Sequence, residues 1–219
     1  MSPRGLFVTL EGIDRSGKST QARLLAEALG PETVAIREPG GTALGEQIRS
    51  LVKDPANAPT PRAEALLFAA ARAQVASEVI EPALQRGLTV VCDRFLDSSL
   101  AYQGAARGLG IEAVREINRF GIGELTPDVT ILLELGPTSA EARAGQVDRF
   151  EAEGMELQNQ VAEAYRALAL AAPVPWHAVD ADRDEAAVHA DILAIVELQP
   201  AAGEHVGQRA EQDLDVTPQ

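Results

Sequence analysis

Short apolar runs alternate with longer amphipathic stretches along the first 199 residues of the chain. The short runs are rich in β-branched residues and have the length of buried strands. They predict strands at Leu6–Leu10, Thr33–Ile36, Thr89–Cys92, Val129–Leu133 and Trp176–Val179. The stretches rich in Ala, Leu and Glu predict helices at Lys18–Leu29, Leu44–Leu51, Arg62–Gln85, Glu112–Phe120, Glu156–Ala171 and Asp184–Leu198. This alternation predicts an α/β fold, a doubly wound five-stranded parallel sheet with helices on both faces.

The length and the hydrophobic content fit one folded unit. A chain of 219 residues with 46% hydrophobic residues can bury one sizeable core. We therefore expect a single domain over residues 1–199. Residues 200–219 are polar and acidic with little apolar periodicity, which predicts a disordered C-terminal tail.

Charge and composition exclude several classes of protein. Asp and Glu number 33 against 19 Lys and Arg, a net charge of −14 that repels a phosphate backbone and argues against general nucleic-acid binding. Cys92 is the one cysteine, so no internal disulfide can form, and its apolar run predicts that it is buried. No basic leader and no run of about 18 apolar residues occurs. We expect a cytoplasmic protein without a membrane segment.

The most specific motif directly follows the first predicted strand. It has the pattern G-x-x-x-x-G-K-[ST] between a strand and a helix, the setting in which such a loop binds phosphate. The glycines allow backbone N–H groups to curl around a phosphate, Lys18 adds a full charge, and Ser19 offers a hydroxyl to Mg²⁺. The predicted nucleotide-binding residues are Gly12, Ile13, Asp14, Arg15, Ser16, Gly17, Lys18, Ser19 and Thr20.

A phosphate-binding loop does not by itself name the reaction, because switch GTPases, transport ATPases and small-molecule kinases share it. No asparagine in the chain is followed by lysine, so the guanine-reading motif of GTPases is missing, as is the Leu-Ser-Gly-Gly-Gln signature of transporters. The third predicted strand ends at Asp93 and Arg94. A carboxylate that can hold magnesium beside a guanidinium that can hold phosphate indicates a kinase.

Four sequence blocks resemble the thymidylate kinase family and occur in the family's order. They are Glu11–Thr20, Arg37–Thr42 (Arg-Glu-Pro-Gly-Gly-Thr), Leu66–Arg72 and Asp93–Gly104, with a weaker fifth block at Asp148–Glu151. The resemblance implies a P-loop NTPase type of fold and transfer of the γ-phosphoryl group of ATP to dTMP. The products would be dTDP and ADP, for dTTP synthesis. It also implies a requirement for Mg²⁺, held by Ser19 and Asp93, and a homodimer.

The resemblance also assigns the residues around the base and the sugar of dTMP. Phe68 would stack on the base, and Arg72, one helical turn later, would donate to the base edge. Arginine has donors and no acceptor, so it suits the O4 of thymine and mismatches the amino group of cytosine. Ser99 and Gln103 would assist at the base edge, and Tyr102 would lie under the deoxyribose.

Around the acceptor phosphate, the family pattern implies Arg37 or Arg49 together with Arg94. Glu38 would help to orient the sugar end and a magnesium-linked water. Asp14 would bind the 3′-hydroxyl group of the sugar, since the attacking phosphate oxygen is already ionised near neutral pH and needs no base.

The source of the catalytic cation stays open at this stage. Lys18, Asp14, Asp93 and Arg94 are expected in the catalytic centre, and Arg15 lies in the loop itself. The family also has a pattern in which a lid, here near residues 137–155, supplies the arginines, and this segment contains Arg143 and Arg149. Other nucleoside or nucleotide kinases and a nucleotide-dependent switch module remain as alternative functions.

Overall fold

The computed structural model describes residues 4–143, 149–150, 153–174 and 176–199. Its centre is a five-stranded sheet in the order β2-β3-β1-β4-β5, with every neighbouring pair parallel. The strands are β1 (Phe7–Glu11), β2 (Thr33–Arg37), β3 (Thr89–Asp93), β4 (Val129–Glu134) and β5 (His177–Asp180). The predicted five-stranded parallel sheet is confirmed.

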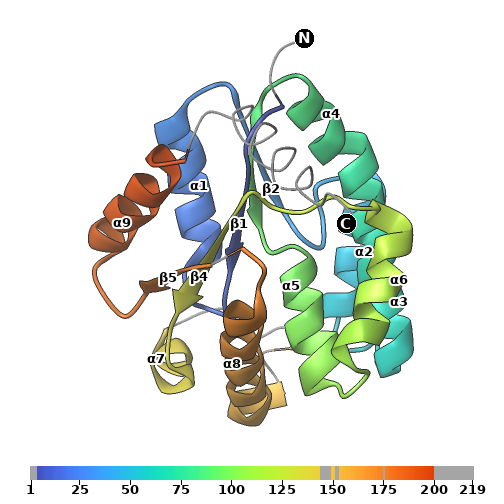
Figure 1. Ribbon diagram of the computed structural model, residues 1–219. Coiled ribbons are helices and arrows are strands. Elements are labelled where there is room, and N and C mark those ends of the chain that lie inside the picture. Colours follow the sequence, from blue (N-terminus) through green and yellow to red (C-terminus); the bar gives the residue numbers. More distant parts are fainter. Residues whose placement is uncertain (1–3, 144–148, 151–152, 175, 200–219) are drawn as a thin grey trace, which may run out of the picture.

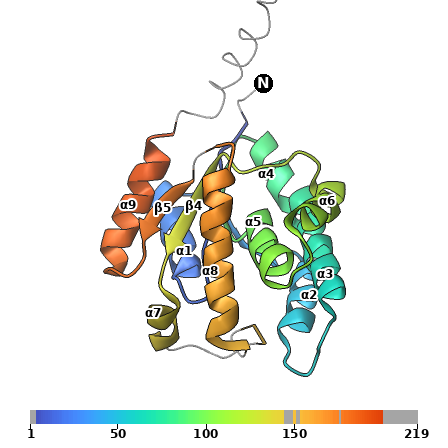
Figure 2. The same cartoon turned by 60° about the horizontal axis from the view of Figure 1, so that its bottom comes forward.

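Helices cover both faces of this sheet, as the doubly wound prediction requires. Helices α1 and α9 lie on one face, and the segments from α2 to α6 lie on the other (Figure 1). Helix α8 packs along η2 (Figure 2). The bounds are α1 Lys18–Leu29, α2 Ala43–Lys53, α3 Pro61–Val75, α4 Glu81–Gln85, α5 Leu96–Ser99, α6 Ile111–Ile122, α7 Pro137–Ala142, α8 Gly154–Ala171 and α9 Glu185–Glu197, with π-helical segments η1 Ala76–Ile80 and η2 Leu100–Ala106.

Each predicted strand stops one residue too early, and in each case the missed residue is charged. These last residues are Glu11, Arg37, Asp93, Glu134 and Asp180. A pattern of apolar residues ends at the first charge, whereas the backbone pairing continues past it. The carboxyl edge of the sheet therefore carries a row of ionisable groups, at the place where ligands bind in folds of this class.

Two helical regions differ from the prediction. The predicted helix Arg62–Gln85 is continuous in the chain but contains the π-helical turn η1 between α3 and α4. The segment from α5 through η2 was not predicted as a helix, nor was α7. The α5 to η2 segment contains two serines and a glycine, which have weak helix propensity, so packing and side-chain hydrogen bonds must stabilise it.

The core lies on both sides of the central strand β1. Val8 and Leu10 pack into one cluster with Leu25 of α1, and Phe7 packs on the other side against Phe95, edge to face, with ring centroids 5.0 Å apart. Burial of such a side chain contributes roughly 1.5–3 kcal/mol. Cys92 is fully buried, as predicted, and burial raises the pKa of its thiol well above its usual value.

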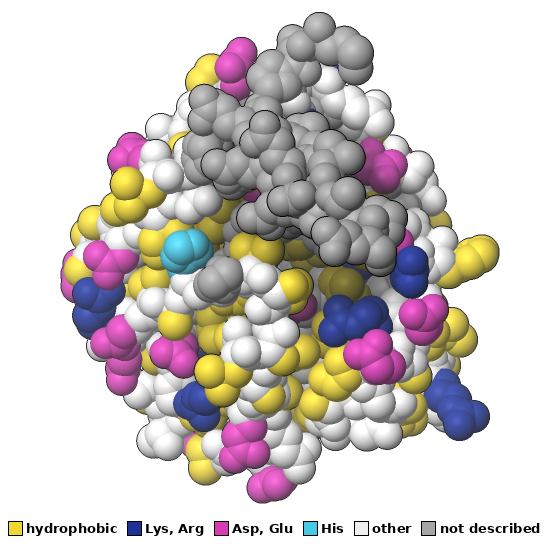
Figure 3. Space-filling model, in the orientation of Figure 1, with side chains coloured by type: hydrophobic (Ala, Val, Ile, Leu, Met, Phe, Trp, Pro, Cys, Tyr) yellow, Lys and Arg dark blue, Asp and Glu magenta, His cyan; other side chains and the backbone are white. Residues whose placement is uncertain are grey.

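Charged side chains of both signs are scattered among apolar ones over the described part of the face in Figure 3. Within the described ranges, no helix is both long and apolar enough to cross a lipid bilayer. The predicted tail, residues 200–219, lies outside the described residues, and so do positions 144–148 and 151–152 of the predicted lid.

Candidate active site

The loop between β1 and α1 leads into the N-terminus of a helix. Gly17 precedes α1 with φ of 97°, and Arg15 has φ of 62°, a left-handed conformation that is uncommon for a residue other than glycine. No side chain caps α1, and its first turn, which is described throughout, contains no acidic residue. The positive end of the helix dipole thus faces the loop, an arrangement that favours an anion.

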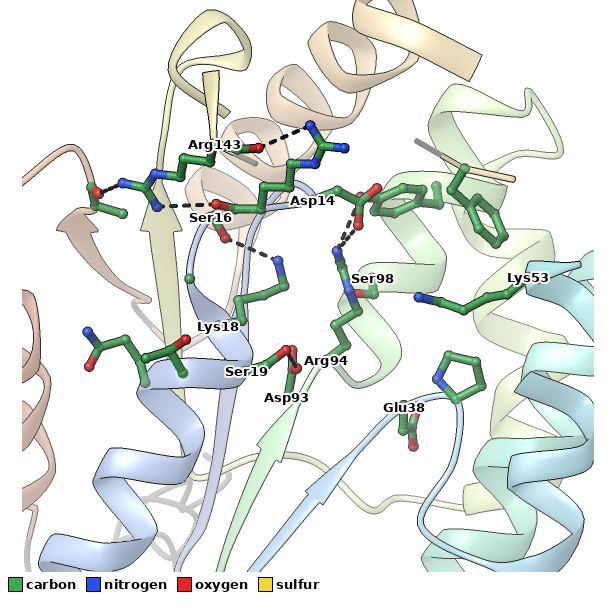
Figure 4. A pocket seen from close by; sticks show the side chains of 18 of the residues that line it. Asp14, Ser16, Lys18, Ser19, Glu38, Lys53, Asp93, Arg94, Ser98 and Arg143 are labelled. Carbon is green, nitrogen blue, oxygen red and sulfur yellow. Dashed lines mark hydrogen bonds and ion pairs between the residues drawn. The ribbon is translucent and has the colours of Figure 1, made fainter. Parts of the chain in front are cut away.

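The Lys18 side chain folds back over this loop. Its Nζ donates to the Ile13 carbonyl oxygen at 2.5 Å and to Ser16 Oγ at 3.1 Å. Figure 4 shows the contact with Ser16. Burial, together with the positive charge of Arg94, lowers the pKa of Lys18 to about 7. A phosphate in the loop would raise the pKa of Lys18 again, because an anion stabilises the charged form of the amine.

Ser19 and Asp93 form a small oxygen-rich site at the carboxyl end of β3. Ser19 Oγ donates to Asp93 Oδ2 at 2.5 Å. The other oxygen, Oδ1, is buried and has no hydrogen-bond partner among the described residues. Mg²⁺ prefers hard oxygen ligands and is usually held by one or two carboxylates together with substrate phosphates and waters. A hydroxyl beside a carboxylate with an unpaired buried oxygen fits this ion.

Arg94 connects the loop to the far side of the site. It directly follows β3 with φ of 71°, and its Nη2 donates to Asp14 Oδ1 at 2.6 Å. Its Nη1 donates to the Gly12 carbonyl oxygen at 3.0 Å and to Ser98 Oγ at 3.1 Å. Burial acts to raise the pKa of Asp14, but the charges of Arg94 and then Lys18 outweigh it and lower the pKa below its usual value. Asp14 is therefore an anion at neutral pH.

One cavity of about 570 Å³ joins these groups to an aromatic end. Phe68 of α3 and Tyr102 of η2 line that end together with Phe150. The Phe150 ring meets both of the others edge to face, at centroid distances of 5.8 Å and 6.2 Å. The cavity therefore has a cationic end at a helix N-terminus and an end where a flat apolar group can lie.

Comparison with known proteins agrees with this geometry. A family model described as thymidylate kinase matches residues 10–192. The chain belongs to the thymidylate kinase family. The thymidylate kinase of Leifsonia xyli is 50% identical over 195 residues, which cover 86% of this chain and 92% of that protein. That of Pelotomaculum thermopropionicum is 46% identical over 202 residues, 89% of this chain and 94% of the relative.

A solved structure extends the likeness to three dimensions. The crystal structure of thymidylate kinase from Ehrlichia chaffeensis superposes with a TM-score of 0.74 at 31% identity, covering 89% of this chain and all of that one. The family and the P-loop NTPase fold expected from the sequence are confirmed. The activity is that of a thymidylate kinase, an ATP-dependent phosphotransferase that acts on dTMP.

Most residues that the sequence analysis assigned to a thymidylate kinase site do line this cavity. They are Asp14, Arg15, Ser16, Gly17, Lys18, Ser19, Thr20, Glu38, Arg49, Phe68, Asp93, Arg94, Ser99, Tyr102, Gln103 and Arg143. Figure 4 shows how loop, strand ends and helices contribute them. Residues separated by more than a hundred positions thus come together at the carboxyl edge of the sheet, the edge at which ligands bind in open α/β sheets.

Five predicted site residues do not line the cavity: Gly12, Ile13, Arg37, Arg72 and Arg149. Gly12 and Ile13 support the loop, and a Cβ at Gly12 would lie 2.7 Å from the carbonyl oxygen of Leu133. Arg37 is half-exposed and pairs with Glu46 at 3.2 Å. Arg149 donates to the Val52 carbonyl oxygen at 2.8 Å, away from the phosphate-binding loop.

Arg72 lies inside the protein, behind the aromatic end of the cavity. Its Nε donates to Glu38 Oε2 at 2.7 Å, and its Nη1 donates to Ser99 Oγ at 3.0 Å and to Asn118 Oδ1 at 2.5 Å. Its Nη2 donates to the carbonyl oxygen of Phe95 at 2.9 Å. Protein groups thus engage four of its five N–H donors. Burial raises the pKa of Glu38 to about 7, although Arg72 opposes the shift.

The cavity is also lined by several residues that were not predicted from the sequence. They are Gln21, Pro39, Lys53, Ser98, Phe150, Ala181, Arg183, Glu185 and Val188. Lys53 ends α2, and Phe150 stands inside the weak fifth block, so the block itself was a usable signal for Phe150. Nothing in the local pattern around Lys53 distinguishes it from a solvated lysine at a helix end.

Proposed function

We propose that the cavity holds both substrates of the thymidylate kinase reaction, with the ATP phosphates in the Gly12–Thr20 loop and dTMP at the aromatic end. One observation carries this proposal: a single cavity is lined by residues 14–20 of the loop, by Phe68 and Tyr102, and by Arg94, which contacts both Asp14 and the Tyr102 ring. Phosphoryl transfer depends on alignment and charge neutralisation more than on covalent chemistry, so a cation at the junction is what the reaction requires.

On the donor side, Lys18 and the backbone N–H groups of the loop hold the β- and γ-phosphates. Arg15 and Arg143 stand at the outer edge of the loop, where they can neutralise charge on the transferred group. Ser19 and Asp93 hold Mg²⁺, which supplies charge neutralisation and a fixed template for the phosphates when it is bound. In this arrangement, Asp93 acts as a ligand and not as a base.

On the acceptor side, Phe68 stacks on thymine and Tyr102 lies under the deoxyribose. Arg94 and Arg49 bind the acceptor phosphate, and Lys53, which lines the same cavity, is a third cation for it. Arg49 already donates to the carbonyl oxygen of Pro39 at 2.9 Å, which fixes its position. Glu38 orients the sugar end.

Three further roles complete the acceptor site. Asp14 accepts the 3′-hydroxyl, and its low pKa keeps it an acceptor. Ser99 and Gln103 face the base edge. Arg72 acts on the base through Ser99, to which its Nη1 donates.

A titration of acceptors tests the proposal. Formation of ADP from ATP is measured with dTMP, dUMP, dCMP, dGMP and thymidine at matched concentrations. We expect dTMP to give the highest kcat/KM, and thymidine to give almost none, because it offers no phosphate to Arg49 and Arg94. A preference for dGMP or for thymidine would contradict the placement of the acceptor and would favour the alternative nucleotide or nucleoside kinase.

We also propose a homodimer, formed through the outer side of α2, α3 and α6. These three helices pack side by side and carry large exposed apolar side chains: Leu44, Leu51, Leu66 and Phe120. Phe120 is 97% exposed, an unusual state for a phenylalanine unless another surface covers it. The cytoplasmic location expected from composition stays a prediction.

A further inference from the structure

A buried carboxylate stands directly behind the aromatic end of the cavity. Glu64, in the first turn of α3, is 1% exposed. It accepts hydrogen bonds from Gln103 Nε2 at 2.9 Å, from Arg107 Nε at 3.2 Å and from Arg149 Nη2 at 2.5 Å. A buried carboxylate with three such partners from distant parts of the chain fixes their positions, because moving any of them would leave charge uncompensated.

The contact with Gln103 also fixes which way its side-chain amide points. A carboxylate can only accept, so the NH₂ branch of the amide must face Glu64. The carbonyl branch, Oε1, lies in the same amide plane but on the opposite side of the Cγ–Cδ bond, so it points away from Glu64. Gln103 is 1% exposed, yet it lines the cavity. An acceptor is consequently what this side chain offers to a ligand there.

We propose that Glu64 is a positioning residue for base recognition: by holding the Gln103 amide group, it presents Oε1 as the acceptor for the N3–H group of the acceptor base. Thymine and uracil carry a hydrogen on N3, and cytosine carries a lone pair there. The N3 of cytosine would face the Gln103 oxygen acceptor to acceptor, which leaves both groups unpaired in a buried site. This inference rests on the proposed placement of dTMP between Phe68 and Tyr102.

A change at Glu153 provides the matched control, because Glu153 pairs with two of the three residues that contact Glu64. Arg107 and Arg149 both also pair with Glu153, whose side chain is 30% exposed and makes no hydrogen bond with Gln103 in the described part of the chain. A change at Glu153 therefore disturbs the same arginines, and with them the cation–π contacts that Arg107 and Arg149 make with the Phe150 ring. It leaves the amide of Gln103 in place. Glu64→Gln therefore disturbs both the Gln103 amide and the two arginines, whereas Glu153→Gln disturbs the arginines alone.

The experiment compares kcat/KM for dTMP, dUMP and dCMP in the full-length protein and in Glu64→Gln. This change keeps the side-chain shape but replaces a group that can only accept by an amide that can also donate, so the Gln103 amide is no longer held in one orientation. We expect the preference for dTMP over dCMP to fall roughly fivefold to twentyfold. The preference for dTMP over dUMP should stay constant, because the two bases share N3–H and differ only in the methyl group. The KM for ATP should not change. Glu153→Gln should leave all three ratios unchanged.

The outcomes separate this inference from the proposed function. A wild-type protein that does not phosphorylate dTMP would overturn the proposed function, whatever the variants do. If the wild type is active and Glu64→Gln keeps its preference over dCMP, or loses both preferences together, Glu64 is a structural residue and the inference is wrong. Should Glu64→Gln fail to fold, Glu64→Asp retains the charge for the arginines but withdraws it from Gln103, and the same ratios decide. In Gln103→Met, Glu64→Gln should cause no further change in the dTMP to dCMP ratio.

Discussion

Arg15 and Arg143 each donate a hydrogen bond to the backbone carbonyl oxygen of the other residue, both at 3.2 Å. Arg15 belongs to the phosphate-binding loop, and Arg143 follows the end of α7. The Arg143 guanidinium also donates to the carbonyl oxygen of Ala181 at 2.6 Å and lies close to Gly17. The cation in the loop and the cation in the lid, two alternatives in the sequence, therefore stand side by side.

The first prediction follows from this pair. Arg15→Ala should lower kcat by up to about 10³-fold while the Kd for ATP stays within a few-fold, because the benefit of such a cation arises mainly in the transition state. Arg143→Ala should have a smaller effect alone and a further effect in the double variant. Single-turnover kinetics and ATP titration measure both. Arg149→Ala should keep the kcat; a loss of kcat in this variant alone, with the KM for dTMP unchanged, would assign the catalytic cation to Arg149.

A second prediction concerns the magnesium site. Mg²⁺ added together with ATP should raise Tm beyond the rise that ATP gives alone, because a ligand that binds only the folded state stabilises it. Asp93→Asn removes the charge of the carboxylate but nearly preserves its shape, so the Mg²⁺ increment should disappear while much of the increment from ATP alone remains. Differential scanning calorimetry with and without Mg²⁺ measures these increments in Tm, and the result does not depend on turnover. An unchanged Mg²⁺ increment in Asp93→Asn would place the ion elsewhere.

The buried position of Arg72 predicts a stability defect that its sequence motif does not suggest. Arg72→Ala leaves Glu38 buried without its cation, a change that typically costs about 3–5 kcal/mol of unfolding free energy. Arg37→Ala removes an exposed arginine paired with Glu46 and should cost about 1 kcal/mol or less. Urea unfolding of the two variants measures the difference. Equal stability of the two would mean that solvent reaches the Arg72–Glu38 pair.

A fourth prediction concerns pH. Burial, and then the negative charge of Glu11, raise the pKa of Asp97 from 3.8 to about 7, against the opposing charges of Arg115 and Arg72. Between these two values the folded protein keeps a proton that the unfolded chain has released, so the contribution of Asp97 to stability falls as the pH rises through this window. Asp97→Asn, which stays neutral, should be more stable than the wild type at pH 8.

The advantage of Asp97→Asn should nearly vanish near pH 4, where the carboxyl group is protonated in the folded state and only about half ionised in the unfolded chain, whose pKa is 3.8. Denaturant unfolding at the two pH values gives the comparison. A stability difference that is the same at pH 4 and pH 8 would show that the amide acts through hydrogen bonding and not through the missing charge.

The fifth prediction tests the dimer. Phe120→Glu should shift the molar mass in solution from that of a dimer to that of a monomer, because a charge in an apolar interface remains unpaired. Leu198→Glu is the control, since Leu198 is 82% exposed next to α9, on the opposite face of the sheet. Light scattering during size-exclusion chromatography measures both. A wild-type monomer, or a Phe120→Glu dimer, would contradict the proposed interface.

Local sequence is enough to predict the five strands, most of the helices and the phosphate-binding loop. Strand β3 and helix α1 follow from local periodicity, because a run of β-branched residues and an amphipathic repeat have few other ways to bury their apolar side chains. The loop motif is contiguous, so its glycines, Lys18 and Ser19 are brought together by the chain itself. The family blocks are contiguous for the same reason, and they sufficed to assign the activity.

Which charged groups meet depends on how separate elements pack against one another. Arg15 and Arg143 are 128 positions apart, and Glu64 and Arg149 are 85 apart. Whether an arginine faces a ligand, as its motif suggested for Arg72, or is occupied by neighbours inside the protein depends on distances of a few ångströms between separate elements. A hydrogen bond or an ion pair weakens strongly when its two partners move apart by a few ångströms, whereas an apolar face stays buried after a shift of that size. For this reason, the apolar pattern predicted the fold, and the partners of Arg72, Arg149 and Gln103 emerged only from the packed structure.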